Sequence, residues 1–356
     1  MIKTLLLLLT ACFFLSGCNS HKENIVLDFA TWGSASEMKI MRNIINDFEA
    51  MHPTIKINVQ HIPQNYFKKL HLLFASNSAP DVILINNQNI PTYADFLITF
   101  NPKDYQGFFP NAIKGLSHRN ELKAAPRDIS TLVIYYNKNL TNPTKSWTYT
   151  DFMSEGARLQ QQEKFLIALE RDIFYLYPFI LSEGEDAKSI KDNNLDKYNS
   201  VKLYKNLSEK YHYAPLLHEI GMATPAEFFL NQKCAYYLSG RWMTPKITEQ
   251  ATFEWGIIEF PRGKAGSVVP CDATGWAVTK NTKHLNEALT FVKYLSSETS
   301  LRQLGQSGLI VPAKINSAKS TAPNIFIQTG INSSTINYPV KYDKLKDKIN
   351  QKLKNP

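Results

Sequence analysis

The sequence predicts an α/β protein of two lobes, and three observations predict it. Residues 25–85 alternate between short apolar runs and segments whose apolar residues recur at helical spacing. A second series of strand and helix patterns begins after Pro126. Residues 18–356 are also too many for one ordinary hydrophobic core and about right for two domains of common size.

The first series of elements has the pattern of a βαβαβ unit. Short apolar or alternating runs predict strands at residues 25–29, 55–59 and 81–85. Apolar residues at spacings of mostly three and four predict helices between them, at residues 38–48 and 66–74. Such units form an open, mainly parallel sheet that binds ligands beyond the carboxyl ends of its strands. Trp32 and Asn86, which follow the first and third strands, are therefore candidate binding residues.

The second series begins with a strong strand signal. β-Branched and aromatic residues fill positions 131–136, and further strands are expected within residues 231–242, 254–260 and 276–278. A helical face is expected over residues 288–304. The tail is a candidate amphipathic helix with one apolar side, made of Tyr342, Leu345, Ile349 and Leu353. We expect this helix to pack against a lobe.

The first eighteen residues have the pattern of a lipoprotein signal. Residues 5–15 are mostly apolar, long enough for a signal peptide but short of the roughly 20 apolar residues that span a bilayer. Small residues, Ser16 and Gly17, precede Cys18, whose thiol would be acylated after cleavage. We expect residues 1–17 to be removed, residues 18–23 to form a lipidated tether, and the protein to sit on the periplasmic or extracellular side of a membrane. An uncleaved anchor with a chance cysteine is the alternative.

The composition argues against several classes of partner. The net charge is +9, but the lysines are scattered and no basic run interleaves with aromatic residues, so we expect no nucleic-acid partner. Cys234 and Cys271 remain after processing, either as two free buried thiols or as one disulfide. No glycine-rich phosphate loop and no metal-binding cluster is evident, so we expect neither cofactor nor metal.

Ser36 and Lys39 form the one pattern that suggests catalysis. Their spacing is that of the Ser-x-x-Lys motif of penicillin-binding hydrolases, whose lysine can deprotonate a serine on the same helix face. No Lys-Thr-Gly motif follows anywhere in the chain. A lipoprotein hydrolase is therefore a remote alternative.

Several motifs in order along the chain resemble the extracellular solute-binding proteins of ABC sugar importers, the maltose-binding-like group. They lie at residues 29–33, 48–57, 79–82, 125–138, 146–149, 239–243, 272–278 and 307–313. The resemblance implies a periplasmic-binding-protein fold with a ligand cleft between two lobes joined by hinge strands. It assigns residues 24–130 and 268–314 to the first lobe and residues 131–267 and 315–356 to the second. The stretch after Pro312 is short for this group.

The resemblance also implies a function without covalent chemistry. The chain would be a monomeric, lipid-anchored protein that captures a carbohydrate and delivers it to an ABC permease in the membrane. A sugar presents flat C–H faces and a rim of hydroxyls, so its site needs aromatic platforms and hydrogen-bonding partners. Trp32, Trp242 and Trp276 are candidate platforms, and a core role is the alternative for each.

Three charged residues are further candidates near the expected cleft. Arg127 and Asp128 precede the hinge strand, where they either bind ligand hydroxyls or form a buried ion pair that fixes the hinge. Arg241 would suit a carboxylate or phosphate, because a guanidinium binds such groups through two parallel hydrogen bonds. It therefore motivates an alternative ligand, an anionic polyol derivative such as glycerol phosphate or a uronate. Packing of Arg241 on Trp242 is the other possibility.

Overall fold

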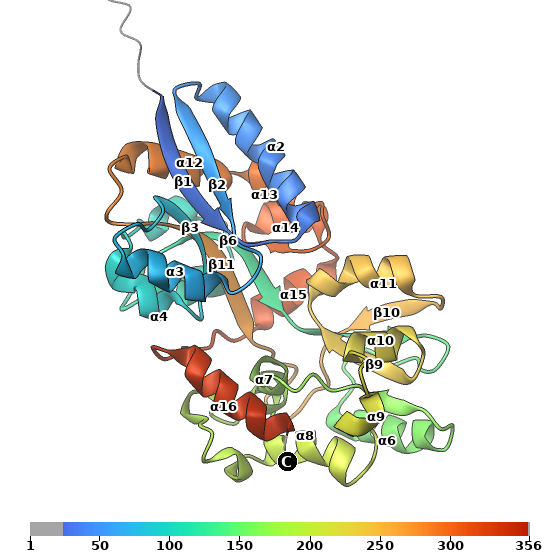
Figure 1. Cartoon of the computed structure of the whole chain (residues 1–356). Helices are drawn as coiled ribbons and strands as arrows, with labels where there is room; N and C mark the ends of the chain where they lie inside the picture. The colour runs from blue at the N-terminus through green and yellow to red at the C-terminus, as the bar shows by residue number, and fades with distance from the viewer. Residues whose placement is uncertain (1–23, 355–356) are drawn as a thin grey trace, which may run out of the picture.

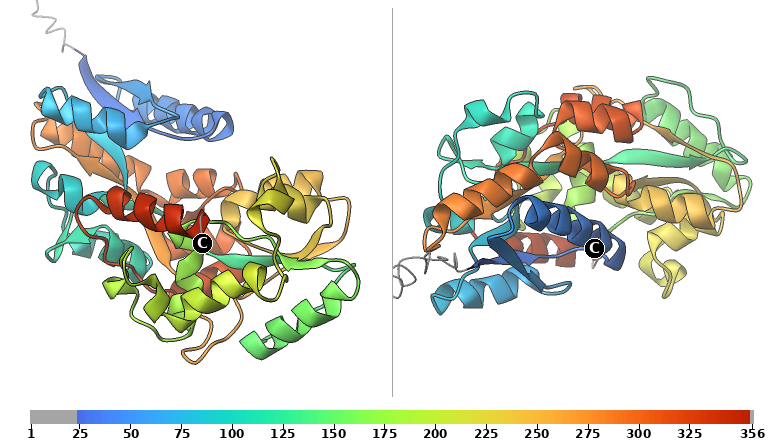
Figure 2. Two further views of the ribbon diagram at one scale, coloured as in Figure 1. Left: turned by 60° about the horizontal axis from the view of Figure 1, so that its bottom comes forward. Right: turned by 90° about the horizontal axis from the view of Figure 1, so that it is seen from above.

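The computed structural model describes residues 24–354 and arranges them around two β-sheets (Figure 1). The expected signal peptide, the tether and Cys18 lie outside the described residues. The first sheet has six strands in the order β12-β6-β11-β3-β1-β2, and the second has four in the order β10-β7-β9-β8. Two further views show the blue helices of the first lobe to one side of the green and yellow helices of the second (Figure 2).

The predicted βαβαβ unit is confirmed in the first lobe. Its elements are β1 (Ile25–Thr31), α2 (Ala35–Met51), β2 (Ile55–His61), α3 (Tyr66–Ala75) and β3 (Val82–Asn86). Strand β1 pairs in parallel with both β2 and β3. A capping box starts α2, because the Ser34 hydroxyl accepts from the Glu37 N–H while the Glu37 carboxylate accepts from the Ser34 N–H.

The six-stranded sheet is mixed, which differs from the mainly parallel sheet predicted. β11 (Cys271–Val278) runs antiparallel to both β3 and β6 (Ala125–Thr131), and β12 (Val311–Pro312) runs antiparallel to β6. β11 is also longer than the strand expected at residues 276–278. Its first half carries the small and polar sequence Cys-Asp-Ala-Thr-Gly, which has little strand signal of its own, and pairing with β6 keeps it extended.

One strand passes directly between the lobes. β6 ends at Thr131, and after Leu132 the chain enters β7 (Val133–Asn137), which pairs with β9 (Cys234–Ser239) and β10 (Trp255–Ile258) of the second sheet. β8 (Phe165–Ile167) pairs in parallel with β9. Side chains alternate across β7: Tyr135 faces a hydrophobic cluster continuous with the first lobe, and Ile134 faces a separate cluster of the second lobe.

Helices cover both sheets. Those of the first lobe are α4 (Ile90–Tyr93), α5 (Pro110–Gly115), α12 (Leu285–Leu295), α13 (Glu298–Gly305), α14 (Ile315–Thr321) and α15 (Asn324–Asn332), with 3-10 turns η2 (Ala94–Phe96) and η3 (Pro102–Tyr105) and the hairpin β4 (Ser117–His118) and β5 (Glu121–Leu122). Those of the second are α6 (Tyr149–Gln160), α7 (Ile173–Ser182), α8 (Asn199–Glu209), α9 (Leu217–Ile220), α10 (Pro225–Leu230), α11 (Thr244–Gln250) and α16 (Tyr342–Lys354), with 3-10 turns η4 (Ala187–Ser189), η5 (Leu195–Lys197) and η6 (Arg241–Met243). None of the described helices combines the length and apolar character needed to cross a bilayer.

The C-terminal stretch is shared between the lobes. Helices α14 and α15 contact α13, β12, β6 and α5 of the first lobe, and Phe326 and Ile327 of α15 are buried. This packing differs from the expected division after residue 314, and the lobe boundaries otherwise stay a prediction. The predicted tail helix is present as α16, which contacts α7 and buries Tyr342, Ile349 and Leu353.

Trp276 belongs to the core, which corrects its proposed contact with ligand. It is 0% exposed on β11, where it pairs in register with Leu84 and Ala125. A fully enclosed indole has no face to offer a ligand. The two cysteines, Cys234 and Cys271, are also buried, and both are free thiols.

We expect Trp276→Ala to lower the free energy of unfolding by about 3–5 kcal/mol, because it empties a large aromatic site in a packed core. Trp276→Phe should cost much less. It keeps most of the ring volume and removes an indole N–H that has no hydrogen-bond partner among the described residues. Urea unfolding followed by circular dichroism measures both variants. Equal costs for the two would contradict the buried placement.

Candidate functional site

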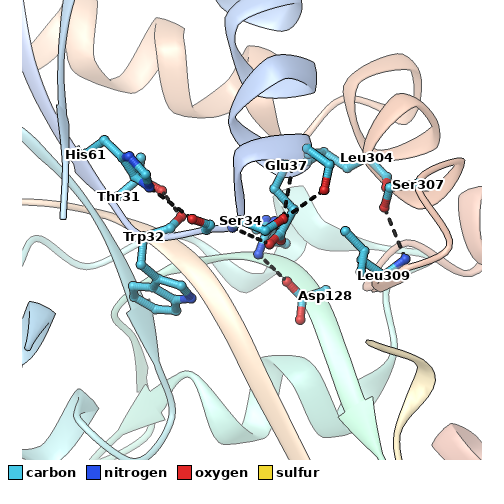
Figure 3. Close-up of polar contacts among 12 residues, drawn as sticks. Thr31, Trp32, Ser34, Glu37, His61, Asp128, Leu304, Ser307 and Leu309 are labelled. Atoms are coloured by element: carbon cyan, nitrogen blue, oxygen red, sulfur yellow. Dashed lines mark hydrogen bonds and ion pairs between the residues drawn. The ribbon is translucent and has the colours of Figure 1, made fainter. Parts of the chain in front are cut away.

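Trp32 lies at the carboxyl end of β1, at the sheet edge where binding is predicted. After Thr31 the chain turns through Gly33, whose φ of 147° favours glycine, into helix α2. The indole packs against Tyr66 and Phe67 of α3, with ring centroids 4.8 and 5.6 Å away. Trp32 is half-buried, and its ring points away from α2 (Figure 3). An aromatic ring supported on one side in this way can stack on an apolar ligand face.

A chain of charges joins the start of α2 to β6 beside this tryptophan. Arg127 Nη2 lies 3.1 Å from Glu37 Oε1, and Arg127 Nη1 lies 3.0 Å from Asp128 Oδ2. Arg127 and Asp128 are both buried, so the ion-pair role considered for them is the one observed. Figure 3 shows Glu37, near the start of α2, and Asp128 of β6 close to each other. One guanidinium faces two carboxylates, which leaves the cluster with an excess of acceptor oxygens.

The two carboxylates of this cluster respond to burial differently. Burial raises the pKa of Glu37, but the charge of Arg127 and hydrogen bonds from Ser34 outweigh it, so the net effect lowers this pKa. For Asp128, burial dominates and raises the pKa to about 6, although Arg127 opposes the shift. Asp128 therefore changes its protonation state close to neutral pH.

Asn86 occupies the same level of the sheet. It pairs in register with Thr274 of β11, and Thr274 pairs with Asp128 of β6. The Asn86 side-chain oxygen accepts hydrogen bonds from the backbone and side-chain nitrogens of Asn89, at 3.1 and 3.0 Å. The amide of Asn86 thus shapes the turn after β3 while remaining half-buried at the edge.

In the second lobe, Trp242 lies in the turn that follows β9. Gly240 is needed there, because a Cβ at that position would overlap the Trp242 ring. The Trp242 ring lies 6.4 Å from Phe174 of α7, centroid to centroid, and both residues are half-buried. The second lobe therefore presents an aromatic pair where the chain leaves β9.

Three further residues of this region were not among the predicted site residues, namely Glu170, Phe174 and Tyr175. The first follows β8 and accepts a hydrogen bond from the Tyr237 hydroxyl at 3.2 Å. Burial raises its pKa. The other two lie in the apolar stretch of residues 165–181, where a half-buried aromatic cannot be told from a core one. For Glu170, the available signal was the charged run Glu170-Arg171-Asp172 inside this apolar stretch.

Arg241, by contrast, does not present its guanidinium to a ligand. It is 5% exposed, and its nitrogens donate to the backbone carbonyls of Gly305, Gly308 and Thr321. The expected anion contact and the expected packing on Trp242 are both replaced by this set of bonds. Its Nη1 has no hydrogen-bond partner among the described residues, but the whole side chain is buried, so the guanidinium is not presented to a carboxylate or phosphate in solution.

Two surface pockets lie away from these residues. One of about 900 Å³ is lined by residues of the first lobe such as Tyr105 and Lys293, and one of about 610 Å³ by residues of α6 and α8 in the second. Neither contains a predicted ligand residue. Within residues 24–354, no three histidine, cysteine or acidic side chains gather as metal ligands would.

We expect Asp128→Asn to change how stability depends on pH. Between pH 3.8, the ordinary value, and about 6, native Asp128 holds a proton that the unfolded chain releases, so ionisation lowers the free energy of unfolding as pH rises. The asparagine variant lacks this loss. Its free energy of unfolding, minus that of the wild type, should therefore increase from about pH 4 to about pH 7. Urea unfolding across this range measures the difference, and a flat difference would contradict the raised pKa.

Solved structures share this fold. A substrate-binding protein of Listeria monocytogenes in complex with cycloalternan superposes with a TM-score of 0.79 at 19% identity, covering 94% of this chain and 93% of that one. The GacH receptor of Streptomyces glaucescens, solved unliganded and with acarbose, superposes with a TM-score of 0.78 at 19% identity, covering 93% and 92%. These similarities confirm the two-lobed periplasmic-binding fold.

Sequence relatives point to the same group. The multiple sugar-binding protein of Streptococcus mutans is 25% identical over 332 residues, covering 83% of this chain and 77% of the relative. The maltodextrin-binding protein of Bacillus subtilis is 22% identical over 291 residues, covering 74% and 68%. The family model of bacterial extracellular solute-binding proteins matches residues 43–325, most of the chain. This match sets aside the hydrolase considered for Ser36 and Lys39, and the chain belongs to the family of bacterial extracellular solute-binding proteins.

Proposed function

We propose that this protein is a lipid-anchored binding protein that captures a neutral carbohydrate between its lobes and delivers it to an ABC import permease. The aromatic rings of the two lobes are the main support for a carbohydrate ligand. Half-buried aromatic rings follow a strand in each lobe, Trp32 after β1 in the first and Trp242, packed with Phe174, after β9 in the second. Aromatic rings beside carboxylates match the alternating apolar faces and hydroxyl rims of a sugar.

The relatives support this ligand class. The two sequence relatives are described as sugar- and maltodextrin-binding proteins, and the two similar structures were solved with cycloalternan and acarbose. These ligands are oligosaccharides or resemble them. We therefore favour an oligosaccharide over a single sugar ring.

The charges at the site favour a neutral ligand over the anionic alternative. Arg127 is already paired with Glu37 and Asp128, and Arg241 is engaged by backbone carbonyls. The second lobe contributes Glu170, another carboxylate. A uronate or glycerol phosphate would meet acceptor oxygens where it needs a free cation, whereas sugar hydroxyls can donate to those oxygens.

Closure of the lobes about the hinge would change the shape that a permease recognises. The lobes are joined through β6 and β7 with Leu132 between them, and such hinges allow lobes to close on a ligand. Closure changes the outer shape of the molecule without any covalent step. We infer that the permease distinguishes the closed, loaded form from the open one, and that the protein acts as a monomer.

We expect neutral oligosaccharides to stabilise the chain from Asn19 onward, and sugar acids and glycerol phosphate to leave it unchanged. A ligand at 100 times its Kd stabilises by about 2.7 kcal/mol, which raises the melting temperature by a few degrees. A thermal-shift screen with maltose, maltotriose, a cyclic tetrasaccharide, glucuronate and glycerol phosphate measures this. Stabilisation by the anions alone would contradict the neutral ligand.

We expect Trp32→Ala and Trp242→Ala each to weaken binding of the best oligosaccharide at least tenfold, about 1.4 kcal/mol, because each removes a stacking surface. Trp255→Ala is the matched control. Trp255 is also half-buried, but it lies on β10 opposite Asn137, at the end of β7 away from the hinge. Isothermal titration calorimetry on folded samples should show an unchanged Kd for the control. Equal losses for all three variants would argue against the assigned site.

The lipid anchor has a separate test. We expect the full-length chain expressed in a bacterium to lose residues 1–17 and to carry acyl groups on Cys18, because the signal pattern places a thiol at the cleavage point. Intact-mass spectrometry of the membrane fraction shows the added mass. Cys18→Ser should abolish it. A mature chain that keeps Met1 would contradict the proposed anchoring without affecting ligand binding.

A further inference from the structure

Arg241 extends from the second lobe into the first. It begins the 3-10 turn η6, one residue after β9, yet its partners lie 64–80 residues further along the chain, at the ends of α13 and α14 and in the turn after α13. Arg241 Nη2 lies 3.2 Å from the Gly305 carbonyl and also donates to the Thr321 carbonyl, and Nε lies 3.2 Å from the Gly308 carbonyl. Gly305 is the last residue of α13 and Thr321 the last of α14.

The first-lobe surface that contacts Arg241 is suited to a cation. The last carbonyls of a helix have no partners within the helix and carry a partial negative charge. Two such helix ends meet at Arg241, and the guanidinium also lies 6.0 Å from the centre of the Phe326 ring of α15. Burial lowers the pKa of Arg241 to about 10, so the guanidinium remains charged at neutral pH. A lysine has no planar fork of donors and could not serve three carbonyls in different directions.

The turn at residues 240–244 is also hydrogen-bonded within the second lobe. The Tyr135 hydroxyl of β7 lies 3.0 Å from the Gly240 carbonyl and 2.7 Å from the Thr244 hydroxyl, so it brackets Arg241 and Trp242. Gly308, with a φ of 74°, closes the turn after α13 that offers one of the three carbonyls. Residues 240–244 are therefore fixed to both lobes at once.

We propose that Arg241 is an interlobe pin: a positioning residue that holds the second lobe against the ends of α13 and α14 and so sets where Trp242 stands relative to the first lobe. It limits rotation about the β6–β7 crossing, and it does not touch ligand. The role of Trp242 rests on the proposed function, whereas the pin itself does not. Loss of the pin leaves each lobe folded but widens the range of lobe arrangements. Only a fraction of these can bind ligand between the lobes, and apparent Kd rises in inverse proportion to that fraction.

The test compares Arg241→Met and Arg241→Lys with Arg158→Met. Arg158 is the control within one lobe. It is more exposed than Arg241, but it too donates to a backbone carbonyl, that of Leu140, and pairs with Glu155, and all three residues belong to the second lobe. Spin labels at Lys69→Cys on α3 and Lys202→Cys on α8, both exposed, report the distance between lobes by double electron–electron resonance without any ligand. The Arg241 variants should broaden this distance distribution, with lysine intermediate, and the Arg158 variant should leave it unchanged.

Ligand titration then separates the two proposals. If loss of the pin lowers the fraction of binding-competent lobe arrangements about tenfold, Arg241→Met should raise the Kd for the best oligosaccharide about tenfold. The Arg158 variant should keep the wild-type Kd. An unchanged distance distribution in both Arg241 variants would overturn the pin, even if the wild type binds sugar. A broadened distribution in a protein that binds no sugar would uphold the pin and refute the proposed function. Should Arg241→Met fail to fold, Arg241→Lys alone decides the question.

Discussion

The architecture depends on the passage of one strand from the first sheet into the second. β6 and β7 are separated by Leu132 alone, and β11 pairs with β6 up to Thr131. This pairing aligns Asn86, Thr274 and Asp128 in one row at the edge of the first sheet. A connection this short lets the lobes rotate about it but does not let them separate. The residues proposed to bind ligand lie on both sides of this crossing.

The two lobes each bury an arginine, but the groups that pair with the guanidinium differ. In the first lobe, Arg127 is enclosed by two carboxylates, so the guanidinium is neutralised and acceptor oxygens remain. Arg241 of the second lobe is enclosed by carbonyls at helix ends instead. Both arginines stabilise the arrangement of elements, since an unpaired buried charge would be costly. Neither arginine presents a free guanidinium to an anion, and this supports the proposed neutral ligand.

Local patterns were enough to predict the βαβαβ unit, the strand at the crossing and the helix α16. The βαβαβ unit and α16 have recurring apolar positions, and the strand at the crossing has a run of mainly β-branched and aromatic residues. The site was predicted less well. Trp32 follows a strand in a parallel unit, so its place at the sheet edge could be deduced, but Trp276 follows no such rule and its burial depends on β3 and β6 together. The partners of Arg241 lie far along the chain and are backbone carbonyls. Every residue has a backbone carbonyl, so the residue types at these positions could not reveal the contact. Phe174 was hidden in an apolar stretch.

Hydrogen exchange with and without the best-binding oligosaccharide shows whether one ligand contacts both lobes. Exchange should slow together in residues 31–37 of the first lobe and in residues 170–175 and 240–244 of the second. Protection confined to one lobe, or to the outer pocket that includes Tyr105 and Lys293, would contradict binding between the lobes.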